Sequence, residues 1–136
     1  MNKTMDLIAA SDRTTPKFNM TGLKPGKIVH VYDGDTFHIV MSLHNVPYRW
    51  NCRLTGVDTP ELRSKDPREV QLAKQARDWA REKLTDSLVE VDCYGFDKYG
   101  RVLVALSIEN ETVASMLISA GLGRLYDGGK RQPWFT

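Results

Sequence analysis

The sequence predicts an α+β fold that is mainly β, in which five short strands form a closed or nearly closed sheet. Five separate runs are rich in β-branched and aromatic residues or alternate apolar with polar ones, one long stretch with helical spacing follows the third run, and a short helical stretch follows the fifth. The chain has 136 residues, which suits one domain. With 41% apolar and 26% charged residues, its composition is that of a globular protein rather than of a disordered or membrane protein.

Residues 1–24 predict a flexible N-terminal arm, because they are polar, lack periodicity and include Pro16. The domain is expected to span residues 25–136. The apolar run at residues 7–10 is too short for the core of a signal peptide. A cytoplasmic location is therefore expected, and an exported form stays compatible with a processed or recloned N-terminus.

Three strands are predicted in the first half of the domain. Residues 28–32 and 36–42 are rich in β-branched and aromatic side chains, and the sequence between them, Asp33-Gly34-Asp35, is typical of a hairpin turn. Residues 48–57 form the third predicted strand, which ends before Pro60 because proline cannot continue a central strand.

The second half predicts two helices and two strands. A long helix is expected between residues 67 and 85, and its apolar stripe has helical spacing. The stripe consists of Val70, Ala73, Ala76, Ala80 and Leu84, widened by Trp79. Residues 88–93 and 101–108 are the fourth and fifth predicted strands. A short helix should begin at Val113 and end at Gly121, which suits a helix C-terminus.

Charge and cysteine content limit the classes of function. The net charge is +2, which argues against a protein that coats long stretches of duplex by releasing many counterions. No apolar run approaches the roughly 18 residues of a membrane-spanning helix. Cys52 and Cys93 both fall in predicted strands, and two buried thiols are favoured over a bridge.

The first polar cluster is Asp33-Gly34-Asp35-Thr36, at the predicted hairpin turn. Taken alone, it is best explained as an ordinary Asp-Gly turn. The alternative is a metal site, because two carboxylates on either side of a glycine supply hard oxygen ligands for Ca²⁺ or Mg²⁺.

The second cluster joins Arg53 in the third strand to Asp58-Thr59-Pro60-Glu61 at the exit of that strand. One interpretation is a structural ion pair, since a partly buried arginine needs a partner. The other is functional: Asp58 supplies a second metal carboxylate, and Glu61 holds or deprotonates a water molecule.

The third cluster is Asp97-Lys98-Tyr99-Gly100-Arg101, in the turn between the last two strands. Charged turns of this kind are usually solvated surface. Lys98, Tyr99 and Arg101 could instead bind phosphate, with arginine offering a planar two-pronged donor and lysine a point charge.

In their order and local spacing, the three clusters resemble the thermonuclease, or staphylococcal nuclease-like, domain family. The likeness covers residues 27–126. It implies a five-stranded OB-type β-barrel with the site on one rim. It also implies a calcium-dependent nuclease that hydrolyses DNA and RNA at the P–O5′ bond and leaves 3′-phosphate ends.

The resemblance implies a metal site made of Asp35, Asp58 and the backbone carbonyl of Thr59, with Asp33 in the outer shell. One Ca²⁺ ion is the implied cofactor. The sequence does not separate Ca²⁺ from Mg²⁺, because both ions take carboxylate ligands.

The same resemblance implies catalytic roles for three residues and substrate contacts for others. Glu61 would orient or activate the attacking water, while Arg53 and Arg101 would hold the scissile phosphate. Lys98 and Tyr99 would contact a neighbouring terminal phosphate.

By the same resemblance, Tyr126 lies within about one residue of a base-contacting aromatic residue of the family and is a further expected substrate contact. Beyond it, Lys130, Arg131 and Trp134 allow two interpretations. They form a basic, aromatic strip for nucleic acid, or a solvated tail with one packed tryptophan, which is the interpretation we favour.

A different class of function is a non-catalytic OB-type module that binds nucleic acid or protein. Such a module has no need of the complete set Asp35, Arg53, Asp58, Glu61 and Arg101. The expected partners of the enzyme are DNA and RNA, single-stranded or locally opened, and no membrane. A monomer is expected.

Overall fold

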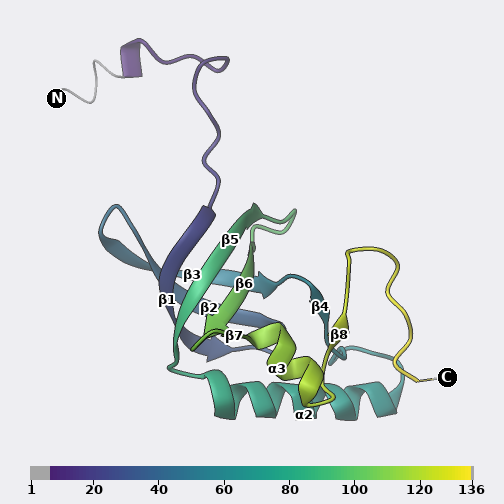
Figure 1. Ribbon diagram of the computed structural model, residues 1–136. Helices are drawn as coiled ribbons and strands as arrows, with labels where there is room; N and C mark the ends of the chain where they lie inside the picture. Colours follow the sequence, from purple (N-terminus) through teal and green to yellow (C-terminus); the bar gives the residue numbers. More distant parts are fainter. Residues whose placement is uncertain (1–6, 136) are drawn as a thin grey trace.

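Five strands close into a barrel in the computed structural model, which describes residues 7–135 (Figure 1). The strands are β1 (Thr21–Val31), β2 (Thr36–Leu43), β3 (Val46–Leu54), β5 (Leu88–Phe96) and β6 (Val102–Ile108). They run antiparallel in the order β3-β2-β1-β5-β6, and a parallel pairing between β3 and β6 closes the barrel. This confirms the predicted mainly β, OB-type architecture.

Three two-residue strands add short ladders at the edges of the barrel. β4 (Val57–Asp58) pairs with β8 (Arg124–Leu125), and β7 (Glu111–Thr112) pairs with the end of β6. The third predicted strand, residues 48–57, is therefore two strands in the structure. Gly56, with a φ of 78°, turns the chain between them and lets β4 leave the barrel.

The first strand begins at Thr21, earlier than the sequence pattern predicts. Residues 21–24, assigned above to the arm, pair with β5. The pattern was misleading because Pro25 and two glycines have low strand propensity, which tertiary pairing overrides. One of them, Gly26, is required by packing: a Cβ atom there would lie 2.9 Å from methyl groups of both Ile39 and Val91.

The two predicted helices are both present and pack against the barrel. The longer one, α2 (Pro67–Leu84), begins at Asp66, whose side chain accepts a hydrogen bond from the backbone N–H of Arg68. Its buried stripe consists of Glu69, Ala73, Ala76, Ala80 and Leu84. The prediction placed Val70 in this stripe, and the structure places Glu69 there instead.

The shorter helix, α3 (Val113–Ser119), ends as expected at Gly121, which has a φ of 74°. Behind it, the N–H of Leu122 donates to the carbonyl of Leu117 over 2.9 Å, which completes a Schellman motif. Within residues 7–135, neither α2 nor α3 is long and apolar enough to cross a membrane.

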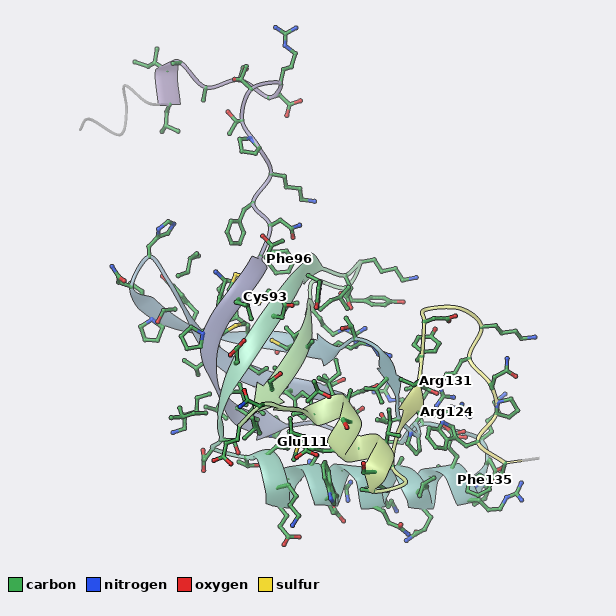
Figure 2. The ribbon with its side chains drawn as sticks, in the orientation of Figure 1. Cys93, Phe96, Glu111, Arg124, Arg131 and Phe135 are labelled. Carbon is green, nitrogen blue, oxygen red and sulfur yellow. The ribbon has the colours of Figure 1, made fainter. Side chains whose placement is uncertain are left out.

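From β8 onward, the chain runs back to the start of α2. We call residues 124–135 the return segment. In Figure 2, Arg124 and Arg131 lie between the looped part of this segment and α2, and Phe135 lies beside the helix. The guanidinium of Arg124 stacks on the ring of Trp134 at 4.2 Å, and that of Arg68 on the ring of Phe135 at 4.9 Å. The tail is therefore exposed over residues 127–130 and has a packed Trp134, as the favoured interpretation expected, but Arg131 and Phe135 also make contacts that this interpretation missed.

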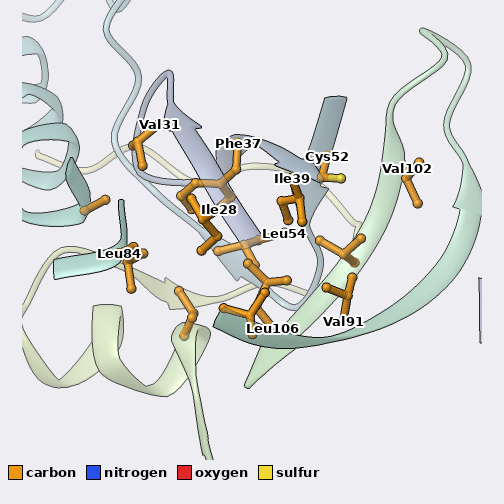
Figure 3. Packing of buried hydrophobic residues seen from close by; sticks show 14 of the residues in the cluster. Ile28, Val31, Phe37, Ile39, Cys52, Leu54, Leu84, Val91, Val102 and Leu106 are labelled. Carbon is orange, nitrogen blue, oxygen red and sulfur yellow. The ribbon is translucent and has the colours of Figure 1, made fainter. Parts of the chain in front are cut away.

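The barrel interior is filled by apolar side chains from every strand of the barrel (Figure 3). Phe37 and Ile39 from β2 meet Val91 and Leu106 from the facing strands, and Leu84 of α2 closes one end. Each such side chain stabilises the fold by about 1.5–3 kcal/mol when fully buried. Cys52 and Cys93 belong to this core as free thiols, as predicted. A rigid interior fixes the positions of the loops at the rim.

Candidate active site

Polar residues from all three sequence clusters line one cleft of about 570 Å³ at the rim of the barrel. Its walls come from the β1–β2 turn, the end of β3, the residues after β4 and the β5–β6 turn. Eight of the ten predicted site residues line this cleft: Asp33, Asp35, Arg53, Asp58, Thr59, Glu61, Tyr99 and Arg101. Segments that are far apart in sequence thus supply one site, as the motif order required.

Asp35 is the acid at the base of the β1–β2 turn, and it is 7% exposed. The backbone N–H of Asp35 donates to the carboxylate of Asp33, and the carboxylate of Asp35 accepts a hydrogen bond from the hydroxyl of Thr36. Arg53 lies 3.6 Å away. Burial and the neighbouring charge of Asp33 raise the pKa of Asp35 to about 7, although Arg53 and Thr36 act in the opposite direction. A buried acid beside a second acid favours a bound cation.

Asp58 lies at the end of β4, is 3% exposed, and has both carboxylate oxygens engaged. Arg124 reaches one oxygen at 3.0 Å, because β4 and β8 pair Asp58 with Arg124. Arg131 reaches the other oxygen, also at 3.0 Å. The next carbonyl, that of Thr59, accepts a hydrogen bond from Arg131 over 3.1 Å. The sequence analysis gave Arg124 no role, and considered Arg131 only as part of a nucleic-acid-binding strip or of a solvated tail.

Glu61 extends into solvent at the mouth of the cleft, with its side chain 57% exposed. Its backbone is fixed from below, because its N–H donates to the carboxylate of Glu69 over 2.8 Å. The sequence analysis missed Glu69. A signal was available, since a glutamate four residues before Ala73 and seven before Ala76 lies on the apolar stripe of the helix.

Arg101 is held by the turn that precedes it. The carboxylate of Asp97 accepts hydrogen bonds from the backbone N–H groups of Tyr99 and Arg101, at 2.8 and 2.9 Å, and from the guanidinium of Arg101 at 2.8 Å. Burial alone would raise the pKa of Asp97, but these hydrogen bonds outweigh burial and hold that pKa below its ordinary value. The third cluster is therefore an ordered turn that orients Arg101, while Lys98, Tyr99 and Gly100 are exposed to solvent.

Two predicted contacts lie outside the cleft wall. The ammonium group of Lys98 lies 5.2 Å from the centre of the Tyr99 ring, beside the cleft rather than in its lining. Tyr126 belongs to the return segment and lines two other hollows, and its hydroxyl donates to the carbonyl of Gly129 over 2.6 Å. Tyr126 thus shares one hollow with Asp58 and the other with Arg53, although it does not line the main cleft.

The donor atoms that line the cleft suit a hard divalent cation. Between residues 7 and 135, no group of three or more His, Cys, Asp or Glu side chains is placed to hold a metal ion. The set implied by the motifs consists of two carboxylates, Asp35 and Asp58, and the carbonyl of Thr59. All three residues line the same cleft. Calcium takes about 6–8 oxygen ligands, so water or substrate would have to complete the shell.

The fold and the cleft define a nuclease-like barrel, and comparison with known families agrees. The family model described as "Staphylococcal nuclease homologue" matches residues 51–133, and the chain belongs to this family. It is 33% identical over 100 residues to a thermonuclease of Staphylococcus hyicus, a match that covers 72% of this chain and 57% of the relative.

A second relative is an uncharacterized protein of Methanocaldococcus jannaschii, 30% identical over 125 residues, with 74% of this chain and 58% of the relative covered. The chain thus spans less than two thirds of the length of both relatives. What the matches show for this chain is its family.

Proposed function

We propose that the cleft hydrolyses phosphodiester bonds of DNA and RNA with the help of one bound Ca²⁺ ion, cutting the P–O5′ bond to leave a 3′-phosphate and a 5′-hydroxyl. One observation carries the proposal: two buried acids, Asp35 and Asp58, and two guanidiniums, Arg53 and Arg101, line the same cleft. A phosphodiester needs both a cation site and anion-binding groups next to its phosphorus atom.

The cation would be held by Asp35, Asp58 and the carbonyl of Thr59, with Asp33 next to this set. When bound, it supplies positive charge that stabilises the extra negative charge of the reacting phosphate. Mg²⁺ takes the same ligands, and a comparison of the two ions belongs to the test below.

Arg53 and Arg101 bind the non-bridging oxygens of the phosphate. A guanidinium offers two parallel N–H donors, which match the geometry of a phosphate. Arg101 is pre-aimed by Asp97, so little reorganisation is needed when the substrate arrives. Arg53 is held near Asp35 and turns from this carboxylate to the incoming phosphate.

Glu61 holds the attacking water. Its carboxylate is exposed at the mouth of the cleft while its backbone is fixed to Glu69, so it can accept a proton as the water oxygen attacks phosphorus. The P–O5′ bond then breaks, the leaving O5′ takes a proton from a solvent water molecule, and Glu61 releases to solvent the proton that it took from the attacking water.

The proposed substrate is a single strand or a locally opened duplex. Tyr99, which is 72% exposed and lines the cleft beside Arg101, contacts a neighbouring terminal phosphate of this strand in our proposal. Lys98, beside it, supplies a charge for a neighbouring terminal phosphate. All proposed groups come from one chain, so we propose a monomer.

The test is a cleavage assay with single-stranded and duplex DNA and RNA, in Ca²⁺, in Mg²⁺ and with a chelator. We expect cleavage that the chelator abolishes, with 3′-phosphate ends. Binding without cleavage by pure protein would instead favour the non-catalytic module, and 5′-phosphate ends would contradict the proposed chemistry.

A Glu61→Gln variant separates binding from catalysis. It should keep its affinity for single-stranded DNA and lose turnover, because glutamine cannot take the proton. Glu82→Gln is the matched control, because Glu82 is exposed on α2. This substitution makes the same chemical change outside the cleft. Equal activity of the two variants would remove Glu61 from the mechanism.

A further inference from the structure

Arg131 brings the return segment into contact with the residues beneath the candidate active site. Its guanidinium lies 3.0 Å from the carboxylate of Asp58, 3.1 Å from the carbonyl of Thr59 and 3.5 Å from the carboxylate of Glu61. These are two of the proposed cation ligands and the proposed general base. A residue more than 60 positions along the chain therefore touches every functional group between positions 58 and 61 that the mechanism uses.

Glu69 connects this contact to helix α2. One oxygen of its carboxylate accepts hydrogen bonds from both the guanidinium of Arg131 and the backbone N–H of Glu61, each over 2.8 Å. The other oxygen accepts from the hydroxyl of Ser64 over 3.0 Å. Glu69 is only 6% exposed, so its charge depends on these donors. Arg131 and Glu69 together bind the backbone of the 59–64 loop, at the Thr59 carbonyl and the Glu61 N–H.

Arg131 holds the loop from outside the cleft, because it is not among the residues that line the cleft wall. The position of Arg131 is fixed by other contacts of the return segment. Arg124 donates to the carbonyls of Gln132 and Pro133 and stacks on Trp134. The guanidinium of Arg131 is thus delivered by an anchored segment, which distinguishes it from a mobile surface arginine (Figure 2).

We propose that Arg131 is a positioning residue of the active site, which acts with Glu69 to fix the Thr59 carbonyl and the Glu61 backbone in the geometry that hydrolysis requires. It touches neither substrate nor cation in this role. Its effect on catalysis rests on the proposed nuclease function, whereas its effect on the loop does not. The return segment is then part of the catalytic structure.

The opposite role would be that of a competitor. A guanidinium bonded to Asp58 and Thr59 repels an incoming dication and occupies lone pairs that the cation needs. The two roles predict different effects of removing Arg131. Removal of a competitor improves cation binding and leaves the loaded enzyme fully active. Removal of a positioning residue lowers turnover even when the cation site is saturated.

The first experiment measures the loop directly. Hydrogen–deuterium exchange of the peptide covering residues 59–66 is compared between the unaltered protein, Arg131→Gln and Lys130→Gln. Lys130→Gln is the matched control, since it removes one positive charge from the adjacent position, outside the cleft lining. We expect at least about tenfold faster exchange at the amide of Glu61 in Arg131→Gln alone. Unchanged exchange there would overturn the proposal.

The same data show whether the variant is folded, because exchange in β2 and β5 should stay as it is in the unaltered protein. Arg131→Lys is the second variant, and it keeps the charge but lacks the planar fork that spans Asp58, Thr59 and Glu69. We expect lysine to leave the loop exchange raised. Full protection restored by lysine would show that charge alone is sufficient, and would contradict the positioning role.

The second experiment follows calcium binding by titration calorimetry and turnover at saturating Ca²⁺. In Arg131→Gln we expect kcat to fall about 10- to 100-fold, as is common for residues that orient ligands, with KM for DNA little changed. Tighter Ca²⁺ binding with unchanged kcat would establish the competitor and overturn our proposal. If the unaltered protein cuts no nucleic acid, the proposed function fails, and the exchange experiment still decides the role of Arg131.

Discussion

The guanidinium of Arg53 lies 3.6 Å from the carboxylate of Asp35, and both residues are held by the same pair of strands. Arg53 faces Thr36 across the β2–β3 ladder, and the N–H of Leu54 donates to the carbonyl of Asp35 over 2.9 Å. The proposed anion-binding group and the proposed cation ligand are therefore fixed relative to each other by backbone hydrogen bonds. A substitution that moves one of these two side chains is expected to move the other.

Arg53→Lys should abolish most activity even though the charge is kept. Lysine offers a point charge in place of two parallel donors, and loss of one such transition-state contact costs about 10²–10³ in kcat. The measurement is kcat on single-stranded DNA at saturating Ca²⁺. Arg49→Lys, four residues earlier on the same strand and exposed, makes the same exchange outside the cleft. Similar losses in the two variants would show that the Arg53 fork has no special role.

Calcium binding should weaken as the pH falls below about 7, the value to which burial and Asp33 raise the pKa of Asp35. A cation requires the deprotonated carboxylate, so below this pKa each binding event must release a proton. We expect the apparent calcium affinity to fall about tenfold per pH unit below that pKa. Calorimetric titrations between pH 5 and pH 8 test this, and a flat profile would contradict it.

Without calcium, the same group should make the protein less stable as the pH rises. The pKa of Asp35 is raised from 3.8 to about 7, so between these values the folded state keeps a proton that the unfolded state has released. The free energy of unfolding therefore falls across this window. Asp35→Asn should remove the fall and be more stable than the unaltered protein at pH 8. Asp78→Asn, on the exposed surface of α2, should leave the pH dependence unchanged.

Asp97 should be as important for activity as the arginine that it orients. Asp97→Ala removes three hydrogen bonds to Tyr99 and Arg101, which frees the guanidinium of Arg101 and loosens the turn. We expect kcat to fall strongly and the free energy of unfolding to fall by about 1–3 kcal/mol. Chemical denaturation and cleavage assays measure the two effects. Asp97→Asn keeps an acceptor for the backbone N–H groups, so it should recover stability more than activity.

Gly34 separates the two acids of the first cluster and packs against the rest of the site. A Cβ atom there would lie 3.2 Å from side-chain atoms of both Thr59 and Ala76. Gly34→Ala should therefore displace Thr59 and weaken calcium binding. The double variant Gly34→Ala, Ala76→Gly opens space on the helix side and should recover part of the affinity, at a cost of about 1 kcal/mol in helix stability. If the calcium affinity did not recover, the effect of Gly34→Ala would come from the β1–β2 turn and not from contact with the helix.

Local patterns predicted most of the fold, because the strands and helices carry their own periodicity. Both helices lie within two residues of their predicted ends, and Asp35, Arg53 and Arg101 share one cleft as the motif order required. The start of β1 escaped prediction, since its first residues are held by pairing with β5 and not by their own propensity.

The return segment could not be predicted, because nothing periodic marks it. Its key contacts join Arg124 and Arg131 to acids 62 to 73 residues away. Two clues were present: a glutamate on the apolar stripe of α2, and two aromatic residues, Trp134 and Phe135, after a polar stretch. A buried acid needs a donor, but the sequence does not tell which arginine supplies it.

The parallel ladder between β3 and β6 joins only residues 52–54 to residues 102–104. Arg53 lies inside this seam, and Arg101 lies immediately before it. If the seam parted while the antiparallel strands stayed paired, the two arginines would move apart although most of the fold persisted. Turnover would then stop at milder denaturant concentrations than those that erase the β-sheet signal, so loss of catalysis would report the opening of one short ladder.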